Sequence, residues 1–378
     1  MKMHPSSTAA VMSLLALSPA YSQSSETIDT TRKIVAVDPS HFIAESLLEE
    51  IIQEERELSD GTTALCYVIK AKSQPHEHEM GPWSPRTVTD GPEKGGIWFE
   101  NGRVYDVDGP FVRNMAVFYN DPEWRLFRED GTIKITESKE AFLAAARPDV
   151  DPEYKNHVVE GKSEWFEGTV TTYVIPVKPI HSEEPYRFGH GAIGLAFNGV
   201  HYDPPAPTQA ILEAHTLAPL DDAGGHLNPF EGYHYHAATG DTKEIGQDDG
   251  HAPQIGYALD GFPIFAHLDE NGQASEGLDE CGGHYDEVRG YHYHAGAPGD
   301  NQIFKAFRGI PGSYTTTRPE WVKEGENARG SGRDGRPPRG EGPPPHERPE
   351  PSTHEGQGAH SHPHTHDGEP HTHDGEPH

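Results

Sequence analysis

The amino-acid sequence predicts a mostly β fold with a few short helices, in which a loop-rich β domain carries a duplicated segment and a disordered tail follows it. Only 33% of the 378 residues are hydrophobic, whereas 41 are Gly and 34 are Pro, a composition typical of loop-rich β chains with a disordered part. Short β-like runs alternate with Asn-Gly and Asp-Gly turns. A sixteen-residue segment also occurs twice in the middle of the chain. An α+β arrangement stays open.

The first residues have the pattern of a secretion signal. Lys2 precedes an apolar run over Ala9–Leu17, and the small residues of Ala20–Ser22 fit a cleavage site. This run is too short to span a membrane, and no later stretch is long and apolar enough to do so. We therefore expect a signal peptide over residues 1–22, a disordered lead over 23–40, no transmembrane segment, and a periplasmic or secreted protein.

Residues 41–155 are predicted to form an N-terminal α+β region. Apolar residues recur at helical spacing in His41–Leu58, which predicts an amphipathic helix that ends at Ser59-Asp60-Gly61. Short β-like runs follow, separated by turn residues: Thr62–Lys70, Gly96–Glu100, Val104–Val107 and Phe111–Tyr119. Glu137–Ala146 is predicted to be a second short helix.

Residues 156–322 are predicted to form the central β domain. Thr169–Val177 is rich in β-branched residues, and Ala192–Phe197 ends in the turn Asn198-Gly199. Beyond it, residues 323–378 contain few apolar side chains and end in two copies of His-Thr-His-Asp-Gly-Glu-Pro. Such a segment buries too little apolar surface to offset its backbone entropy, so we expect a disordered, His-rich tail.

The formal net charge of −31 argues against nucleic acid or an anionic membrane surface as partner, because both require a basic face. The charge suits metal cations, and it also suits a protein that is merely kept soluble. Two cysteines, Cys66 and Cys281, form a disulfide in one interpretation. In the other, Cys66 is a buried strand residue and Cys281 is a metal ligand or a thiol beside the site.

The duplicated segment carries the chemistry. Asp221–His236 reads DDAGGHLNPFEGYHYH and Asp279–His294 reads DECGGHYDEVRGYHYH, and the two agree at nine of sixteen positions without a gap. In a strand, alternate side chains share a face, so the two histidines of each Tyr-His-Tyr-His point the same way. Two imidazoles on one face can converge on one ion. The upstream Gly-Gly-His adds a third imidazole, on a loop that its glycines allow to turn back.

The predicted metal ligands are therefore the three histidines of each copy: His226, His234, His236, His284, His292 and His294. Three imidazoles with an open position suit Zn²⁺ or Cu²⁺. The four tyrosines face the other side, where their hydroxyls can act as outer donors or, for copper, as redox partners: Tyr233, Tyr235, Tyr291 and Tyr293. A hydrogen-bonded ladder without metal is the alternative. The two copies can also meet at a single shared centre.

Other histidines and one aspartate are weaker candidates. His251 is a spare ligand, and Asp260 either orients a ligand imidazole or is only a turn residue. His201, like His190, His215 and His267, is expected to be a surface histidine or one satisfied inside the protein. His76 and His78 lie beside Met80 in a segment that is expected to be solvated. The tail repeat offers weak, multivalent metal binding through His364, His366, His371 and His373, unless the tail is only a spacer.

At these motifs the chain resembles the YHYH protein family. The resemblance rests on Phe197–Val200, on Gly225-His226 with Gly232–His236, on Ile255–Phe265, and on Gly282–His284 with Tyr291–His294. Further motifs extend it to about Cys66–Arg308: His78–Trp83, Lys94–Trp98, Val104–Gly109 and Ala145–Tyr154. The resemblance implies an exported protein in which a role with metal ions is suspected, and it names no reaction. Ala223 in the first copy replaces Cys281 of the second, which argues against a paired-cysteine role.

Three functions follow as expectations. The first is an exported copper- or zinc-binding protein whose tail collects ions. The second is a metal-dependent enzyme, a hydrolase or a copper oxidoreductase, with a three-His site and Asp260 or Glu231 as base. The third is an envelope or matrix protein in which the motifs only hold the fold together.

Overall fold

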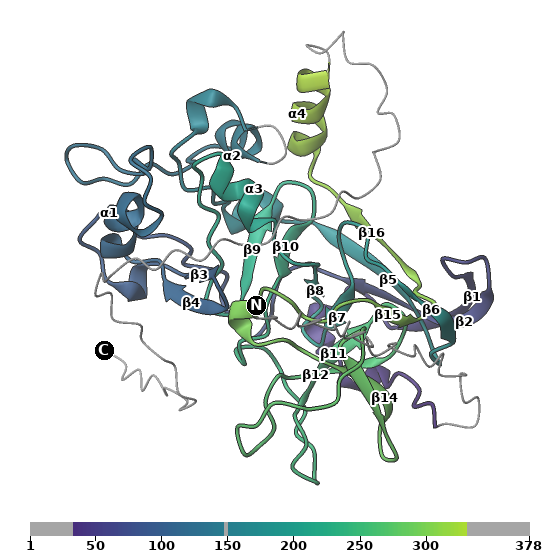
Figure 1. Ribbon diagram of the computed structural model, residues 1–378. Coiled ribbons are helices and arrows are strands. Elements are labelled where there is room, and N and C mark those ends of the chain that lie inside the picture. Colours follow the sequence, from purple (N-terminus) through teal and green to yellow (C-terminus); the bar gives the residue numbers. More distant parts are fainter. Residues whose placement is uncertain (1–32, 147–149, 331–378) are drawn as a thin grey trace, which may run out of the picture. The chain divides into compact units, whose positions relative to one another are not determined.

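The computed structural model describes residues 33–146 and 150–330, and over this part of the chain the fold is mostly β. Strands make up 30% of the structure and helices 17%, with four α-helices, which confirms the predicted fold class (Figure 1). The predicted signal peptide and the tail histidines lie outside the described residues. Among the described helices, none has the length and apolar character that crossing a membrane requires.

A four-stranded antiparallel sheet joins the two predicted regions of the chain. Its order is β1 (Ile52–Glu57), β2 (Thr63–Ala71), β5 (Val170–Pro176) and β16 (Ser313–Thr317). β2 is the buried, β-branched strand on which β1 and β5 pair from either side. Residues on both sides of the predicted boundary at 155/156 therefore share one sheet and pack into the same core clusters.

The predicted helix over His41–Leu58 is wrong. Two 3-10 turns, Pro39–His41 and Ala44–Ser46, lead instead into β1. Pairing of β1 with β2 overrides the helical spacing, and Leu48 and Ile52, two of the apolar residues in that spacing, are 47% and 43% exposed. The segment before it is also more ordered than the predicted lead, because Val37 is buried and its N–H donates to the carbonyl of Val177.

A second correction concerns Phe111–Tyr119, which was predicted as a strand. After the hairpin of β3 (Ile97–Glu100) and β4 (Arg103–Asp106), the chain forms α1 (Gly109–Phe118). The Asp108 side chain accepts a hydrogen bond from the Phe111 N–H, and a proline occupies the first turn, so both common helix-start signals were present. The helix predicted near residue 140 is confirmed as α2 (Lys139–Ala145).

The largest sheet has eight strands and a two-fold pattern. Its order is β13-β14-β12-β11-β7-β8-β10-β9, with β7 and β11 antiparallel at the centre. In the first half-sheet, a hairpin of β7 (Gly194–Ala196) and β8 (His201–Tyr202) is followed by one of β9 (Gly225–Asn228) and β10 (Gly232–Tyr235). The second half-sheet repeats this with β11 (Gln254–Ala258), β12 (Pro263–Phe265), β13 (Gly283–Asp286) and β14 (Gly290–His294).

The duplication is thus longer than the sixteen-residue segment. In each half, the second hairpin joins the first through a parallel pair, β10 with β8 and β14 with β12. The turns Asn198-Gly199 and Asp260-Gly261 occupy matching places, each with its glycine at positive φ. The order of the sheet consequently reads the same from both edges.

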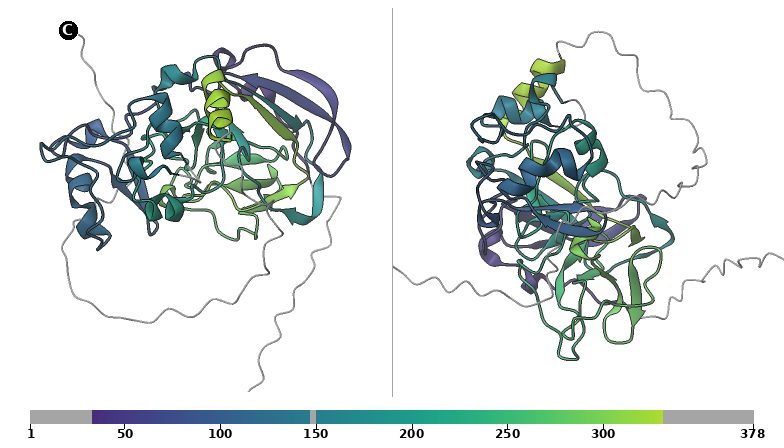
Figure 2. Two further views of the ribbon diagram at one scale, coloured as in Figure 1. Left: turned by 90° about the horizontal axis from the view of Figure 1, so that it is seen from above. Right: turned by 60° about the vertical axis from the view of Figure 1, so that its left-hand side comes forward.

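The remaining elements surround these sheets. β6 (His181–Tyr186) pairs with β15 (Phe307–Gly309), and α3 (Thr208–Glu213) lies between β8 and β9 in the chain. α4 (Glu320–Gly330) contacts α2, as Figure 2 shows. Because α4 continues to Gly330, residues 323–330 are helical, although they were predicted to belong to the disordered tail.

Candidate metal centres

Each duplicated segment folds into a hairpin that places its three histidines side by side. His226 on β9 lies directly opposite His234 on β10, and His284 on β13 lies opposite His292 on β14. The third histidine of each copy was predicted on a loop, and this is corrected: it is a cross-strand partner, which fixes its distance from its neighbour.

Centre 1 consists of His226, His234 and His236. The Nε2 atoms of His234 and His236 are 3.1 Å apart. The ring of His226 is centred 4.8 Å from that of His234 and 5.1 Å from that of His236. His234 and His236 are buried, at 1% and 4% exposure. These three side chains can hold a metal ion.

Centre 2 consists of four histidines, because His251 joins the second copy: His251, His284, His292 and His294. The Nε2 atom of His292 lies 3.0 Å from that of His284 and 3.2 Å from that of His251. The ring of His294 is centred 4.9 Å from that of His251 and 5.0 Å from that of His284. The structure therefore brings the spare histidine to the second copy, and among the described residues no fourth histidine joins the three of the first copy.

The two centres are separate. Centre 1 belongs to the edge hairpin β9–β10 and centre 2 to the edge hairpin β13–β14, at opposite ends of the strand order (Figure 1). The two copies therefore do not share a single centre at the pseudo-two-fold position.

Backbone carbonyls orient the imidazoles. The Nδ1 atoms of His234 and His292 lie 3.0 and 2.9 Å from the carbonyls of Gly232 and Gly290, at matching positions of the two hairpins. The other Nδ1 contacts are His236 to Pro204, His251 to Ala252, His284 to Glu276 and His294 to Ala266. A carbonyl only accepts, so Nδ1 carries the hydrogen and Nε2 presents a lone pair.

The buried imidazoles are neutral at physiological pH. Burial lowers the pKa of His226 and His294 to about 3 and that of His236 and His292 to about 4. Burial, reinforced by neighbouring imidazoles, holds the pKa of His234 well below its usual range. Neutral imidazole is the form that binds a metal ion.

The four tyrosines lie on the opposite face of the strands, where aspartates and amides engage them. Tyr233 donates a hydrogen bond to Asp221 at 2.7 Å, and Tyr291 donates one to Asp279 at 3.0 Å. In each repeat, the carboxylate of the first residue therefore accepts a hydrogen bond from the first tyrosine of the Tyr-His-Tyr-His segment. Tyr293 donates to Asp260 at 2.6 Å, and the amide of Asn198, at the matching turn, donates to Tyr235 at 2.8 Å. His78 also contacts the Tyr235 hydroxyl at 2.8 Å.

The glycines of the repeat are required by the same packing. A Cβ atom on Gly225 would lie 2.6 Å from the Tyr233 ring, and one on Gly283 would lie 2.5 Å from the Tyr291 hydroxyl and from a backbone carbonyl. Gly232 and Gly290, before each Tyr-His-Tyr-His, have φ of 78° and 67°. The shared residues thus build two equivalent hairpins.

Two of the weaker candidates lie away from the imidazole nitrogens. Asp260 is a turn residue: it accepts from the N–H groups of Phe262 and Gly309 as well as from Tyr293. Cys66 and Cys281 are buried free thiols, so the disulfide interpretation is not supported and Cys66 is a strand residue. Burial raises the pKa of Cys281 to about 12, and the thiol is outside both centres.

His201, which was expected to be a satisfied or surface histidine, belongs to a third group of possible metal-binding side chains with Asp203 and His234. All three are buried. Asp203 was not singled out in the sequence at all, because it lies in the chain well before the repeat. Its place beside the centre follows from the pairing of β8 with the Tyr-His-Tyr-His strand, which the sequence does not reveal.

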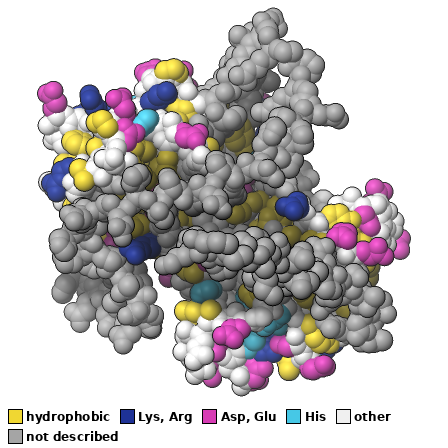
Figure 3. Space-filling model, in the orientation of Figure 1, with side chains coloured by type: hydrophobic (Ala, Val, Ile, Leu, Met, Phe, Trp, Pro, Cys, Tyr) yellow, Lys and Arg dark blue, Asp and Glu magenta, His cyan; other side chains and the backbone are white. Residues whose placement is uncertain are grey.

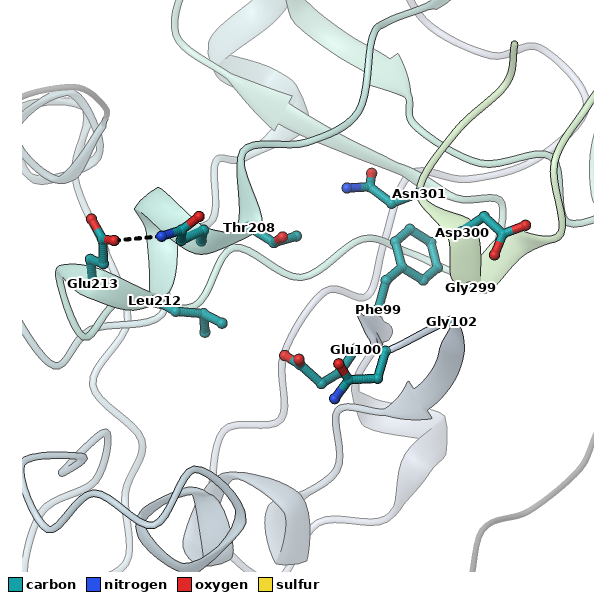
Figure 4. A pocket seen from close by; sticks show the side chains of 11 residues that line it. Phe99, Glu100, Gly102, Thr208, Leu212, Glu213, Gly299, Asp300 and Asn301 are labelled. Carbon is teal, nitrogen blue, oxygen red and sulfur yellow. Dashed lines mark hydrogen bonds between the residues drawn. The ribbon is translucent and has the colours of Figure 1, made fainter. Parts of the chain in front are cut away.

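The cavities of the described region bear differently on the two centres. One of about 640 Å³ is lined by Glu100, Glu213, Asp300 and neighbouring residues, and no histidine is among its lining residues (Figure 4). Another of about 460 Å³ is lined by His251 together with Glu244, Asp269 and Glu270, so centre 2 borders an acidic opening. Figure 3 shows histidine side chains beside acidic ones in the lower part of the view, where Figure 1 has β12 and β14.

Comparison with known proteins gives one match. The family model described as YHYH protein matches residues 172–276, about a quarter of the chain. The match includes the first half-sheet and the hairpin β11–β12, and it ends before the second Tyr-His-Tyr-His. Neither a curated protein nor a solved structure matches the chain. Over residues 172–276 the chain therefore carries the sequence of the YHYH protein family, and the first centre lies within it.

Proposed function

We propose that this is an exported metal-binding protein that holds transition-metal ions, Cu²⁺ or Zn²⁺, in centres 1 and 2. One observation carries the proposal: within each centre, Nε2 atoms that present lone pairs approach to 3.0–3.2 Å. Two such lone pairs repel each other, and a cation between them removes that repulsion. Two nitrogens bound to one ion at tetrahedral angles lie roughly 3.3 Å apart, close to these separations.

The chemistry of the donors supports the choice of ion. Neutral imidazoles suit zinc and copper, whereas magnesium and calcium prefer carboxylate and carbonyl oxygens. The hydrogen bonds from Nδ1 to backbone carbonyls are the outer contacts that metal-binding histidines commonly make. Together these features favour a site for a transition metal.

Export and ion collection rest on the sequence. The N-terminal signal over residues 1–22 supports a periplasmic or secreted protein. The tail holds nine histidines from His346 to His378 in an acidic segment, which supports weak, multivalent capture of ions.

The test is the metal content of the purified full-length chain, compared with a chain of equal length whose tail histidines are replaced by Gln. After mild exposure to Zn²⁺ or Cu²⁺, we expect two tightly held ions per chain in both proteins, measured by elemental analysis. The variants His234→Gln/His236→Gln and His292→Gln/His294→Gln should each lose one ion. A chain that holds no stoichiometric metal, or double variants that both keep two ions, would refute the proposal.

A metal-dependent enzyme is the second candidate, and one feature favours it. Centre 1 has three imidazoles in its histidine set, and a tetrahedral ion held by three protein ligands keeps a position for water or substrate. Glu231, which burial gives a raised pKa, lies near this centre, whereas Asp260 does not. A ligand-exchangeable water in Co²⁺-loaded centre 1, seen by its visible spectrum with and without azide, would favour the enzyme over the binding protein.

A further inference from the structure

The two half-sheets differ at one matched position beside their centres. Asp203 follows β8 in the first half, and Phe265 ends β12 at the matching place in the second. Asp203 donates its N–H to the carbonyl of Tyr235, and the carbonyl of Phe265 accepts from Ala295, so both residues border a Tyr-His-Tyr-His strand. The same place thus holds a carboxylate next to centre 1 and a phenyl ring next to centre 2.

Asp203 is a buried carboxylate, and one of its two oxygens lacks a hydrogen-bond partner. It is 6% exposed, and its Oδ1 atom has no hydrogen-bond partner. The Nε2 atom of His201, 3.4 Å away and fully buried, also lacks one. Among the residues that the structure describes, no Lys or Arg forms an ion pair with Asp203. An uncompensated buried carboxylate is costly, and a bound cation removes that cost.

The separation of Asp203 from centre 1 fits a shared ion. Its Oδ2 atom is 3.9 Å from Nε2 of His234, which is too long for a hydrogen bond. Two atoms that each lie about 2.0–2.1 Å from the same ion can be separated by up to roughly 4.2 Å. An ion bound to Nε2 of His234 is therefore within reach of this carboxylate. Without an ion, Asp203 groups with His201 and His234 and not with His226 and His236, so binding of a shared ion must draw these side chains together.

We propose that Asp203 is the fourth ligand of centre 1, which becomes a site of three imidazoles and one carboxylate, while centre 2 is a site of four imidazoles. This inference rests on the proposed metal binding. His201 lies behind the carboxylate, its ring stacked on that of His234 at 5.7 Å. Its Nδ1 atom contacts the Tyr173 hydroxyl at 3.1 Å, which leaves Nε2 facing Asp203.

Other carboxylates near the two centres are already engaged. Asp286 lies 4.0 Å from Nε2 of His292, almost the distance of Asp203 from His234, yet it forms an ion pair with Arg289 at 2.8 Å. Glu231 takes the position that Arg289 has in the second repeat, and it interacts with Arg318 and Tyr314. Distance alone therefore does not make a ligand, and Asp203 is distinguished by its missing partners.

The assignment bears on the choice between binding and catalysis. With Asp203, both centres offer four protein donors, the arrangement of closed zinc sites, whereas catalytic zinc sites keep one position open. The two centres also differ in charge, because a dication keeps its full charge among four neutral imidazoles and loses one unit beside a carboxylate. We therefore expect two sites that bind metal without an open position for substrate and that prefer different metal ions.

The test compares two carboxylate variants in the full-length chain with Gln in place of the tail histidines. Centre 1 is isolated by His292→Gln/His294→Gln, and Zn²⁺ affinity is measured against a competing chelator. Asp203→Asn should weaken the binding roughly ten- to a hundred-fold or more. The matched control, Asp286→Asn in a chain whose centre 1 is removed by His234→Gln/His236→Gln, should leave the affinity of centre 2 within about threefold, a change too small to mark a lost ligand.

A second measurement separates a ligand from a structural residue. Without metal, Asp203→Asn should be at least as stable as the parent chain in urea denaturation, because it removes a buried carboxylate without partners. Unchanged Zn²⁺ affinity, or a loss of metal-free stability with weaker binding at both centres, would overturn the assignment. Should Asp203→Asn fail to fold, a crystal structure of the Zn²⁺-loaded full-length chain decides: Oδ2 at roughly 2.0–2.2 Å from the ion supports it, and a distance beyond ~3 Å refutes it.

Failure of this inference is distinguishable from failure of the proposed function. If the parent chain binds two Zn²⁺ ions and Asp203→Asn binds them equally well, only the assignment of Asp203 falls. If the parent chain binds none, the metal-binding function falls and the assignment falls with it.

Discussion

At the scale of single residues, the two ring nitrogens have different tasks in six of the seven centre histidines, His226 being the other. Nδ1 is hydrogen-bonded to a backbone carbonyl and sets the direction of the ring, so that Nε2 is left for its neighbours. Replacement by Gln keeps polarity and loses the aimed lone pair. Because the imidazoles are buried, protonating them inside the folded protein is costly.

That cost predicts how the metal-free protein responds to acid. The pKa of the buried histidines is lowered to about 3–4 in the folded chain and returns to ~6.5 on unfolding, so the unfolded chain binds more protons as the pH falls below about 6.5. We expect the free energy of unfolding to fall between pH 7 and pH 5, on the order of 1 kcal/mol for each buried imidazole. Urea denaturation across this range measures it.

The variant His292→Gln/His294→Gln serves as the control, because it removes two of the titrating groups and should show a shallower dependence on pH. A stability that does not change from pH 7 to pH 5 would contradict the neutral, buried state of these rings.

A second residue-scale prediction concerns the glycines under the tyrosines. Gly225→Ala should destabilise the protein by roughly 1–3 kcal/mol, because the new methyl group would lie 2.6 Å from the Tyr233 ring. Gly246→Ala is the matched control: nothing lies within 4 Å of its Cβ position, and a change within about 0.5 kcal/mol is expected. Thermal or urea unfolding gives both values, and equal effects would show that the packing argument is wrong.

The structure brings the six histidines of the repeats together as two sets of neighbours, which strand alternation and equal spacing predict because they are local properties. Their role as metal ligands stays a prediction. His201 and Asp203 escaped prediction for the opposite reason. They reach centre 1 through the parallel pairing of β8 with β10, a contact between segments that no periodicity links. His251 was singled out only as a spare, and its place beside His292 likewise depends on tertiary structure.

At the scale of elements, the turn of each first hairpin supports the strand that carries the proposed metal ligands. Asn198 donates from its amide to Tyr235 and Glu77, whereas Asp260 accepts from Tyr293 and from two backbone N–H groups. The first turn therefore needs a side chain that donates hydrogen bonds, and the second needs one that only accepts them. An amide suits the first, and a carboxylate suits the second.

Asp260→Asn should consequently destabilise the protein by roughly 1–3 kcal/mol, because its new NH₂ group must face a backbone N–H in either orientation. Asp269→Asn is the control, since Asp269 accepts two backbone N–H groups in a solvent-exposed turn and water can replace a lost bond. Urea denaturation at pH 8 compares them. A cost no larger for Asp260→Asn than for Asp269→Asn would contradict this account of the turn.

Prediction of elements succeeded where local signals and tertiary pairing agree, as in β2 and α2. It failed for His41–Leu58, where apolar spacing indicated a helix but pairing with β2 made the last part a strand. The strand predicted over Phe111–Tyr119 failed differently: Asp108 and Pro110 marked a helix start, and aromatic and β-branched residues outweighed them in the interpretation.

At the scale of the whole chain, the centres and the tail should release metal at different acidities. An unperturbed imidazole has a pKa of ~6.5 and is charged at pH ~5, which is what we expect of the tail histidines, whereas the buried histidines, with pKa values of about 3–4, stay neutral. Dialysis of the Zn²⁺-loaded full-length chain from pH 7.5 to pH ~5 should therefore leave about two ions per chain. The chain with Gln in the tail should lose none over this step. Release of all ions from both proteins would show that the centres bind no more firmly than the tail.

The strand order of the eight-stranded sheet places β9 and β13 at its two edges, and each edge strand supplies one histidine to a centre, His226 or His284. An ion bound there ties the edge strand to its neighbour. Chelation would untie both, leaving strands with free backbone groups that can pair with another molecule. We therefore expect the metal-free protein to aggregate more readily than the Zn²⁺-loaded protein, which would give a bound ion a role in preventing self-association.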